Sequence, residues 1–265
     1  MTNPYHVAVI GAGSAGLFGA RELAAQGVHV SLFNRDIKPG GLAEYGIYPE
    51  KHVMKEGLRK QFRHILELAT LEYYGNITFG TRGDLTLDGL RSLGFDAVLV
   101  TVGAQGTKSL NLPGEELEGV YHAKDVVYSQ WRFHFGKRCA IIGAGNVMVD
   151  IARHLINEYK AEQVTAVVRR GPAEVNFTKE EMKHLISYLD LEEFEREMAR
   201  VLPALQAINQ DPEVGRHKVL DSLAKADPKA DSASFHFDFL ASPVGMIGEN
   251  GKLTHMEVED NTLTE

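Results

Sequence analysis

The chain has 265 residues, of which 44% are hydrophobic and 24% charged, and its formal net charge is −8. These values are typical of a packed chain of about two domains, and they exclude wholesale disorder. The acidic balance argues against nucleic acid as a main partner. Because Cys139 is the single cysteine, an internal disulfide, a redox-active cysteine pair and a cysteine-based metal site are excluded within these residues.

A repeated motif is the main organising feature. Residues 7–16 read VAVIGAGSAG, and residues 139–148 read CAIIGAGNVM. Each is a short apolar run that ends in Gly-x-Gly and is followed by helical periodicity, and a second apolar strand follows each helix, at residues 28–33 and 164–168. Two strand–helix–strand starts predict an α/β chain with two Rossmann-like, doubly wound parallel sheets, which bind ligands at the carboxyl ends of their strands.

The remaining elements follow from periodicity and turn residues. The Pro39-Gly40-Gly41 sequence interrupts the chain, and residues 54–68 predict a helix. Residues 103–137 have mixed character and are expected to cross between domains, whereas residues 190–231 are charged, interrupted by prolines, and predict helix plus loop. The Asn250-Gly251 pair favours a type I′ hairpin turn. Four further segments predict strands: residues 76–81, 95–101, 235–240 and 252–258.

Targeting signals are not expected in this sequence. The first residues contain no basic and apolar regions of a signal peptide, and no apolar run is long enough to span a bilayer, so no membrane insertion is expected. A lone cysteine fits a reducing compartment, which favours the cytoplasm. Cys139 lies in a predicted strand and is expected to be an inert core thiol.

The first glycine-rich turn, Gly11-Ala12-Gly13-Ser14-Ala15-Gly16, predicts a dinucleotide site. The first glycine permits a tight turn, the second lets the backbone approach a pyrophosphate, and the third lets the helix pack closely on the strand. The helix N-terminus then presents free N–H groups to the anion. Asn34 stands where an acidic ribose ligand is usual, and Arg35 follows it, so these residues leave flavin and nicotinamide dinucleotides both open.

The second turn, Gly143-Ala144-Gly145-Asn146-Val147, predicts a nicotinamide site. Met148 occupies its third-glycine position, and the strand that follows ends at Arg169-Arg170. Two adjacent guanidinium groups are suited to bind a 2′-phosphate, and no acidic residue stands beside them. The sequence therefore predicts NADP(H) in preference to NAD(H). Two such sites in one chain suggest hydride transfer between a nicotinamide and a flavin, which can release electrons singly.

The chain resembles the adrenodoxin reductase-like ferredoxin–NADP⁺ reductases, two-domain flavoproteins related to the glutathione reductases and the glutamate synthase small subunit. Six stretches carry the resemblance: VAVIGAGSAGLFGA, PGGLAEYGIYPEKHVMK, TVGAQGTKSLNLPGEELEGVYHAKDVV, CAIIGAGNVMVDIARHL, VVRRGPAEVNFTKEEMKHL and ASPVGMIGENGKL. It implies a glutathione reductase-like fold, with residues 1–105 as the N-terminal part of an FAD domain and residues 106–265 as the NADP domain. The family continues beyond the last hairpin, so the C-terminal part of the FAD domain is expected to be absent and the chain to be a fragment.

The resemblance also implies an activity and its residues. It implies an NADP(H)-dependent oxidoreductase that transfers hydride between NADPH and FAD, and single electrons to or from a ferredoxin or similar acidic iron–sulfur protein. His52, one position after the residue aligned with the family's functional histidine, would relay a proton near the flavin. Glu181 would pair with that histidine near the nicotinamide. Backbone approach to FAD would occur at Gly40, Gly41, Leu42 and Gly103.

Several alternatives stay open. Glu181 also fits a helix capping box with Thr178. Lys55, Arg59 and Arg63 share one helix face, which could steer an acidic ferredoxin or simply face solvent. Alternative functions are an electron-feeding subunit of a glutamate synthase-like complex and a non-catalytic nucleotide-binding fragment.

Overall fold

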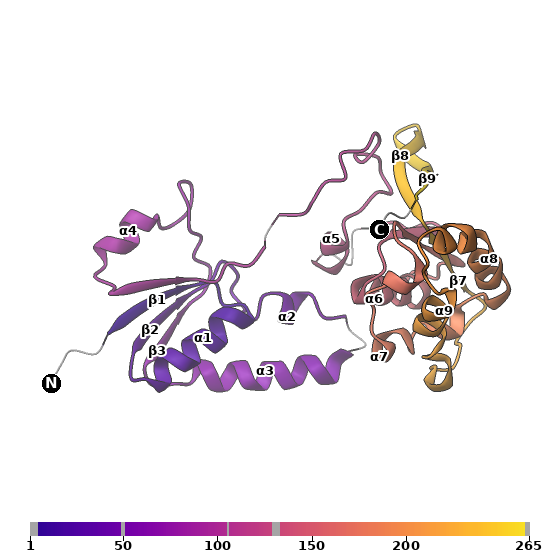
Figure 1. Ribbon diagram of the computed structural model, residues 1–265. Helices are drawn as coiled ribbons and strands as arrows, with labels where there is room; N and C mark the ends of the chain where they lie inside the picture. The colour runs from indigo at the N-terminus through magenta and orange to yellow at the C-terminus, as the bar shows by residue number, and fades with distance from the viewer. Residues whose placement is uncertain (1–4, 49–50, 105, 129–132, 263–265) are drawn as a thin grey trace. The chain divides into compact units, whose positions relative to one another are not determined.

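The structure is a computed structural model, and it divides into two compact units, Met1–Thr107 and Lys108–Glu265, referred to below as unit 1 and unit 2. Figure 1 draws unit 1 in indigo to magenta and unit 2 in rose to yellow. The structure describes residues 5–48, 51–104, 106–128 and 133–262. No helix in these ranges has the length and hydropathy needed to cross a membrane.

Unit 1 is built on a parallel sheet with the strand order β3-β2-β1-β4. Its strands are β1 (His6–Ile10), β2 (His29–Phe33), β3 (Leu71–Tyr74) and β4 (Ala97–Val100). Its helices are α1 (Ser14–Ala25), α2 (Leu42–Tyr45), α3 (His52–Leu66) and α4 (Leu87–Ser92), of which α1 and α3 lie along one side of the sheet (Figure 1). Since β1 has neighbours on both sides, its carboxyl end lies at the switch point where such sheets bind ligands.

Strands β1 and β2 of unit 1 are buried on both faces by apolar side chains, whereas β4 is exposed along its length. Val9 packs in one cluster with Leu17 of α1 and Phe62 of α3. Ile10, the next residue along β1, packs in a second cluster with Leu90 of α4. Alternation of side chains along the strand therefore supplies both layers, which explains the nearly continuous apolar run of β1.

The third strand differs from the sequence prediction. Residues 76–81 do not form a strand, and β3 comprises Leu71–Tyr74 instead. Asn76 adopts the left-handed conformation, with φ of 60°, which ends the extended backbone after β3. Ile77 and Phe79 pack against the second cluster as part of a loop. The alternating apolar residues of this segment are therefore packed as part of a loop and do not add a strand to the sheet.

Unit 2 contains the parallel strands β5 (Arg138–Ile142), β6 (Gln163–Val168) and β7 (Ser234–Phe239), in that order across the sheet. Helix α6 (Asn146–Asn157) joins β5 to β6, and α5 (Ala123–Tyr128), α7 (Lys179–Met182), α8 (Leu191–Ala207) and α9 (Pro212–Leu220) complete the unit. The prediction that prolines interrupt the 190–231 region is wrong at Pro203, which lies inside α8.

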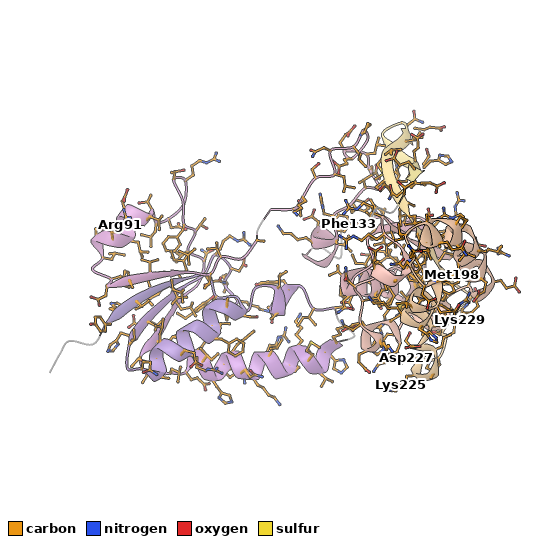
Figure 2. The ribbon with its side chains drawn as sticks, viewed as in Figure 1. Arg91, Phe133, Met198, Lys225, Asp227 and Lys229 are labelled. Carbon is orange, nitrogen blue, oxygen red and sulfur yellow. The ribbon has the colours of Figure 1, made fainter. Side chains whose placement is uncertain are left out.

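The interior of unit 2 is rich in aromatic side chains. Phe235, Phe237 and Phe239 alternate along β7 and are all buried. The rings of Phe237 and Phe239 are stacked, with their centroids 4.9 Å apart. Met198 of α8 is buried, whereas Lys225 after α9 is exposed at the margin of the unit (Figure 2).

The hairpin of β8 (Ala241–Glu249) and β9 (Lys252–Asp260) confirms the predicted turn. Asn250 and Gly251 have φ of 52° and 78°, as a type I′ turn requires. The segment expected to cross between domains packs partly on this hairpin, because the Met246 N–H donates to Pro113 O at 2.8 Å. In the same segment, Glu118 O accepts from the Leu253 N–H at 2.9 Å.

Candidate functional site

The first glycine-rich turn joins β1 to α1 and has no room for a side chain at Gly11 or Gly16, whereas the position at Gly13 is open. A Cβ atom on Gly16 would lie 1.8 Å from Gly11 O, and one on Gly11 would lie 2.5 Å from Thr101 O after β4. Gly11 also has φ of 102°. Helix α1 has no side-chain cap and no acidic residue in its first turn, so its first N–H groups are available to an anion.

The Gly40-Gly41 pair lies against this turn. The Gly40 N–H donates to Ala12 O at 2.6 Å, and a Cβ on Gly41 would lie 3.1 Å from the Cα of Gly13. Both residues of the pair have positive φ angles. Ser14 and Ala15 begin α1 at the same edge, and they are exposed.

Two further predicted residues lie near this edge. Gly103 follows β4 with φ of 66°, two residues after the Thr101 carbonyl that contacts the turn. Leu42 begins α2, and 65% of its surface is exposed. The structure therefore brings together the glycine residues predicted to contact FAD in unit 1.

Asn34, the predicted ribose ligand, is buried beneath the turn. Its side-chain Oδ1 accepts from the Ala12 N–H at 3.0 Å. Its Nδ2 donates to Asp36 O at 2.9 Å and to Lys38 O at 3.3 Å. The amide thus joins the glycine-rich turn to the loop after β2, a bracing role that the sequence did not indicate. Ribose binding by Asn34 stays a prediction.

A second contact in unit 1 was also not evident from the sequence. The Arg59 guanidinium donates from Nε to Glu44 Oε2 at 2.8 Å and from Nη2 to Oε1 at 2.6 Å. This hydrogen bonding holds the pKa of Glu44 below its usual value. The Glu44 side chain is only 10% exposed, so the pair fixes α2 to α3. On the predicted cationic face of α3, the charge of Arg59 is therefore neutralised by Glu44. Lys55 and Arg63 remain as the other cations of that face.

The second glycine-rich turn is more open. Gly143 has φ of 127°, and its N–H donates to Val167 O at 2.9 Å. No described atom outside the adjoining residues lies within 4 Å of a Cβ placed on Gly143 or Gly145. Helix α6 again lacks a side-chain cap and an acidic first turn. Val147 is exposed and Met148 is buried, so the third-glycine position here accommodates a large side chain.

The segment after β6 crosses this turn. The Asn176 N–H donates to Ala144 O, and the Thr178 N–H donates to Asn146 Oδ1, both at 2.8 Å. Thr178 Oγ1 accepts from the Glu181 N–H at 3.3 Å and so caps α7. The Thr178 N–H, which a capping box would pair with the side chain of Glu181, is donated to Asn146 Oδ1. Glu181 is half-buried.

Arg169 and Arg170 follow β6 directly, and both side chains are exposed. Within the described ranges neither guanidinium group has an ion-pair or hydrogen-bond partner. The nearby Arg200 differs, because its guanidinium binds Glu197, Asp238 and Asp260. The two arginines after β6 are thus the cations of this strand end that remain available to an anion.

The two predicted catalytic residues lie in different units. His52 is the first residue of α3 in unit 1 and is exposed, and Glu181 belongs to α7 in unit 2. Their pairing near the nicotinamide stays a prediction.

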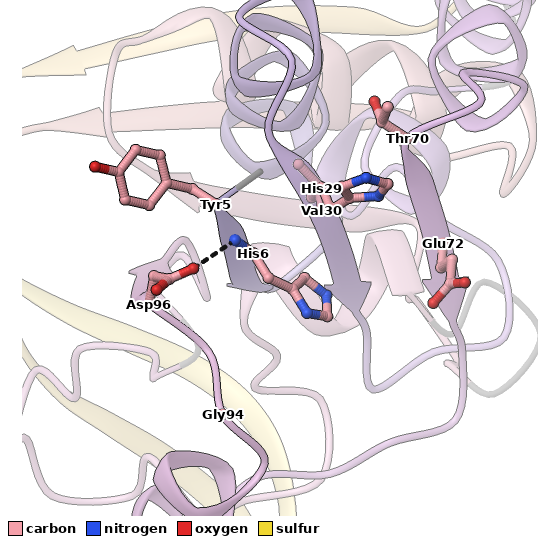
Figure 3. A pocket seen from close by; sticks show the side chains of 8 residues that line it. All are labelled: Tyr5, His6, His29, Val30, Thr70, Glu72, Gly94 and Asp96. Carbon is pink, nitrogen blue, oxygen red and sulfur yellow. Dashed lines mark hydrogen bonds between the residues drawn. The ribbon is translucent and has the colours of Figure 1, made fainter. Parts of the chain in front are cut away.

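A polar hollow of about 450 Å³ lies at the opposite edge of the unit 1 sheet, where the strands begin (Figure 3). Its lining includes His6, His29, Glu72 and Asp96. The Asp96 Oδ2 accepts from the His6 N–H at 2.7 Å, which closes the start of β1 onto the residue before β4. Ligands of parallel sheets bind at the carboxyl ends of the strands, so this hollow is separate from the glycine-rich site.

Comparison with known proteins places these sites in context. Over 96% of its length the chain is 26% identical to NADPH:adrenodoxin oxidoreductase, mitochondrial, of Arabidopsis thaliana, and covers 60% of that protein. Over 98% of its length it is 28% identical to NADPH-ferredoxin reductase FprA of Mycobacterium leprae, and covers 64% of it. The structure of Mycobacterium tuberculosis FprA in complex with NADPH is similar with a TM-score of 0.79 and 27% identity over 99% of the chain, which spans 65% of that protein.

Residues 5–189 match the family described as pyridine nucleotide-disulphide oxidoreductase. This match covers both glycine-rich turns, the Arg169-Arg170 pair and Glu181. The fold agrees, since parallel sheets with crossover helices carry both turns. The chain therefore belongs to the pyridine nucleotide-disulphide oxidoreductase family, and within it is similar to the NADPH-dependent adrenodoxin and ferredoxin reductases.

Proposed function

We propose that the chain is the nucleotide-binding part of an NADP(H)-dependent flavoprotein oxidoreductase that exchanges electrons with a ferredoxin-type iron–sulfur protein. FAD is assigned to the turn Gly11–Gly16 of unit 1, and NADP(H) to the turn Gly143–Val147 of unit 2. The chain spans about 60–65% of the length of its relatives, so the assignment draws on the sites present in these residues.

The observation that carries the proposal is the exposed Arg169-Arg170 pair without an ion-pair partner among the described residues. A solvated, unneutralised pair at the carboxyl end of β6 is arranged to bind a dianionic 2′-phosphate, for which guanidinium geometry is well suited. The open turn at Gly143 and Gly145 leaves space for a pyrophosphate at the uncapped N-terminus of α6.

The fit of unit 1 to FAD rests on its steric features. Close packing at Gly11 and Gly16 brings the uncapped N-terminus of α1 to the end of β1. The Gly40-Gly41 pair lies against the same turn, and Asn34 holds the turn and the following loop in place. When bound, FAD would supply the conversion of a two-electron hydride into single electrons.

The protein's own residues bind and orient the two nucleotides. We assign proton relay near the flavin to His52 and an electrostatic role near the nicotinamide to Glu181. The 265 residues contain one cysteine, so they hold no cysteine pair for disulfide reduction, which favours the ferredoxin-reducing branch of the family. A reducing compartment suits this composition, and the cytoplasm is our proposal, although the Arabidopsis relative is named as mitochondrial.

The test is cofactor discrimination by the Arg169→Ala/Arg170→Ala double variant. The variant would lose two charge-assisted contacts, worth roughly 1.5–3 kcal/mol each. The NADPH dissociation constant should therefore rise by at least about tenfold. NADH binding should barely change. Calorimetric titration of both cofactors measures this.

Arg138→Ala is the matched control, because Arg138 is an exposed cation at the opposite end of the same sheet, where β5 begins. It should leave both dissociation constants unchanged. An equal loss of NADPH and NADH affinity in the double variant would overturn the assignment of NADP(H) to unit 2.

A further inference from the structure

The backbone that carries Arg169 is held by a residue far away in the sequence. Asn261, directly after β9, donates from Nδ2 to Arg169 O at 3.0 Å. The same Nδ2 donates to Ser242 Oγ at 2.9 Å, which orients the amide. The Asn261 N–H donates to Leu240 O at 2.6 Å. The side chain of Asn261 is therefore fixed at the base of the hairpin and directed at the end of β6.

The next two residues of the turn are held as well. Arg170 O accepts from the N–H of Leu240, a buried residue with φ of 52°, at 3.2 Å. The Gly171 N–H donates to Glu174 Oε2 at 2.9 Å. Hydrogen bonds to successive backbone groups thus hold the turn that presents the two guanidinium groups. Among the described residues, the side chain of Asn261 makes the bond to Arg169 O.

Arg200 anchors the base of the hairpin beside Asn261. It donates to Asp260 Oδ1 at 2.8 Å, to Glu197 Oε2 at 2.8 Å and to Asp238 Oδ1 at 3.2 Å. Asp260 is the last residue of β9 and precedes Asn261. Three carboxylates surround this guanidinium, so Arg200 positions the hairpin and is not itself a ligand for a phosphate.

We propose that Asn261 is a positioning residue for 2′-phosphate recognition, acting through the main chain of Arg169. The inference rests on the proposed binding of NADP(H) at Arg169 and Arg170. Bidentate recognition requires the guanidinium group to be held within about 0.5 Å of its productive position. A carbonyl that loses its donor lets the peptide rotate and moves the Cα from which Arg169 extends. Asn261 therefore favours ligands that carry a 2′-phosphate over those that lack it.

The experiment compares two nucleotides that differ only in this group, adenosine 2′,5′-bisphosphate and adenosine 5′-monophosphate, by calorimetric titration of the whole chain. Asn261→Ala should weaken binding of the bisphosphate about three- to tenfold and change that of the monophosphate less than twofold. Ser242→Ala removes only the group that orients the amide, so it should act in the same direction with a smaller effect. Thr254→Ala is the control, because it removes a side-chain bond to Ile247 O elsewhere on the hairpin.

A cycle with Arg169→Ala separates the possible outcomes. In the Arg169→Ala background, Asn261→Ala should have no further effect on the bisphosphate. An equal loss for both nucleotides, or an undiminished loss in that background, would show a general structural role and overturn the inference. If Arg169→Ala discriminates between the nucleotides and neither Asn261→Ala nor Ser242→Ala does, the inference fails and the proposed function stands. If Arg169→Ala and Arg170→Ala do not discriminate, the proposed function itself fails.

Discussion

Single residues of this chain show how burial decides chemical behaviour. Cys139 is half-buried in β5, and its Sγ is 3.4 Å from Gly136 O. Burial raises the pKa of the thiol to about 11, so the reactive thiolate is scarce at neutral pH. The raised pKa agrees with the sequence-based expectation of an inert thiol, whereas the expected core position is only partly met, because Cys139 is half-buried.

We predict that Cys139 of the native protein reacts much more slowly with a disulfide reagent than a free thiol does at pH 8. The reason is the raised pKa together with limited access. Absorbance of the released thiolate measures the reaction, and unfolding in urea should restore the rate of an exposed cysteine. Fast, complete labelling of the folded protein would contradict this account.

Gly16 shows the steric limit at the same scale. We predict that Gly16→Ala lowers the free energy of unfolding by about 1–3 kcal/mol, because its Cβ would overlap the Gly11 carbonyl and push α1 off the sheet. Gly57→Ala is the matched comparison. Gly57 is exposed within α3 and has nothing near its Cβ position, so alanine there should stabilise by roughly 0.5–1 kcal/mol. Urea unfolding of both variants measures these changes. A Gly16→Ala variant as stable as the wild-type chain would be evidence against close packing of α1 on the turn at Gly11.

Between elements, the Glu44–Arg59 pair fixes α2 to α3 beside the glycine-rich turn of unit 1. The folded pKa of Glu44 lies below its unfolded value. Its contribution to stability is therefore complete above the unfolded pKa, at about 4.3, and is lost as pH falls through the folded pKa.

We predict that lowering the pH from 6 to 3 destabilises the wild-type chain more than Arg59→Ala, because the variant has already lost the pair. At pH 6 the substitution should lower the free energy of unfolding by at most about 1.5–3 kcal/mol. Solvent screening at the partly exposed Arg59 places the expected loss at the low end of this range. Urea unfolding at several pH values measures both effects. Lys60→Ala, an exposed cation on the same helix, is the control. Parallel pH profiles for wild type and Arg59→Ala would refute this role.

For the molecule as a whole, charge shapes the encounter with a partner. The net charge of −8 would repel the acidic iron–sulfur protein that we propose as a partner, so its docking would require a local cationic surface. On α3, Lys55 and Arg63 share one face, and the structure removes Arg59 from that face by pairing it with Glu44 and Glu56.

We predict that Lys55→Glu/Arg63→Glu slows association with an acidic ferredoxin roughly tenfold at low ionic strength and flattens its salt dependence. Stopped-flow measurement of the association rate across salt concentrations gives both quantities. Arg82→Glu/Arg91→Glu changes the net charge equally at exposed residues elsewhere in unit 1 and should have a smaller effect. Figure 2 labels Arg91. Equal slowing by both pairs would indicate net charge alone, and would remove α3 from the proposed docking surface.

The sequence alone predicts both strand–turn–helix starts, because glycine patterns and apolar periodicity are local consequences of backbone geometry. It also placed Arg169 and Arg170 at the end of a strand, where the structure shows both exposed, and their binding of a 2′-phosphate stays a prediction. It placed β3 wrongly, since alternating apolar residues occur in buried loops as well as in strands.

The folded packing of the chain fixes which polar groups bind one another. It turned Asn34 toward Ala12, paired Arg59 with Glu44, and directed Asn261 to Arg169, which lies 92 residues earlier. Such partners come from different elements, and no local pattern encodes their meeting. Each buried polar group must find a partner within the fold to offset its lost hydration, so the packing of the elements selects the partner.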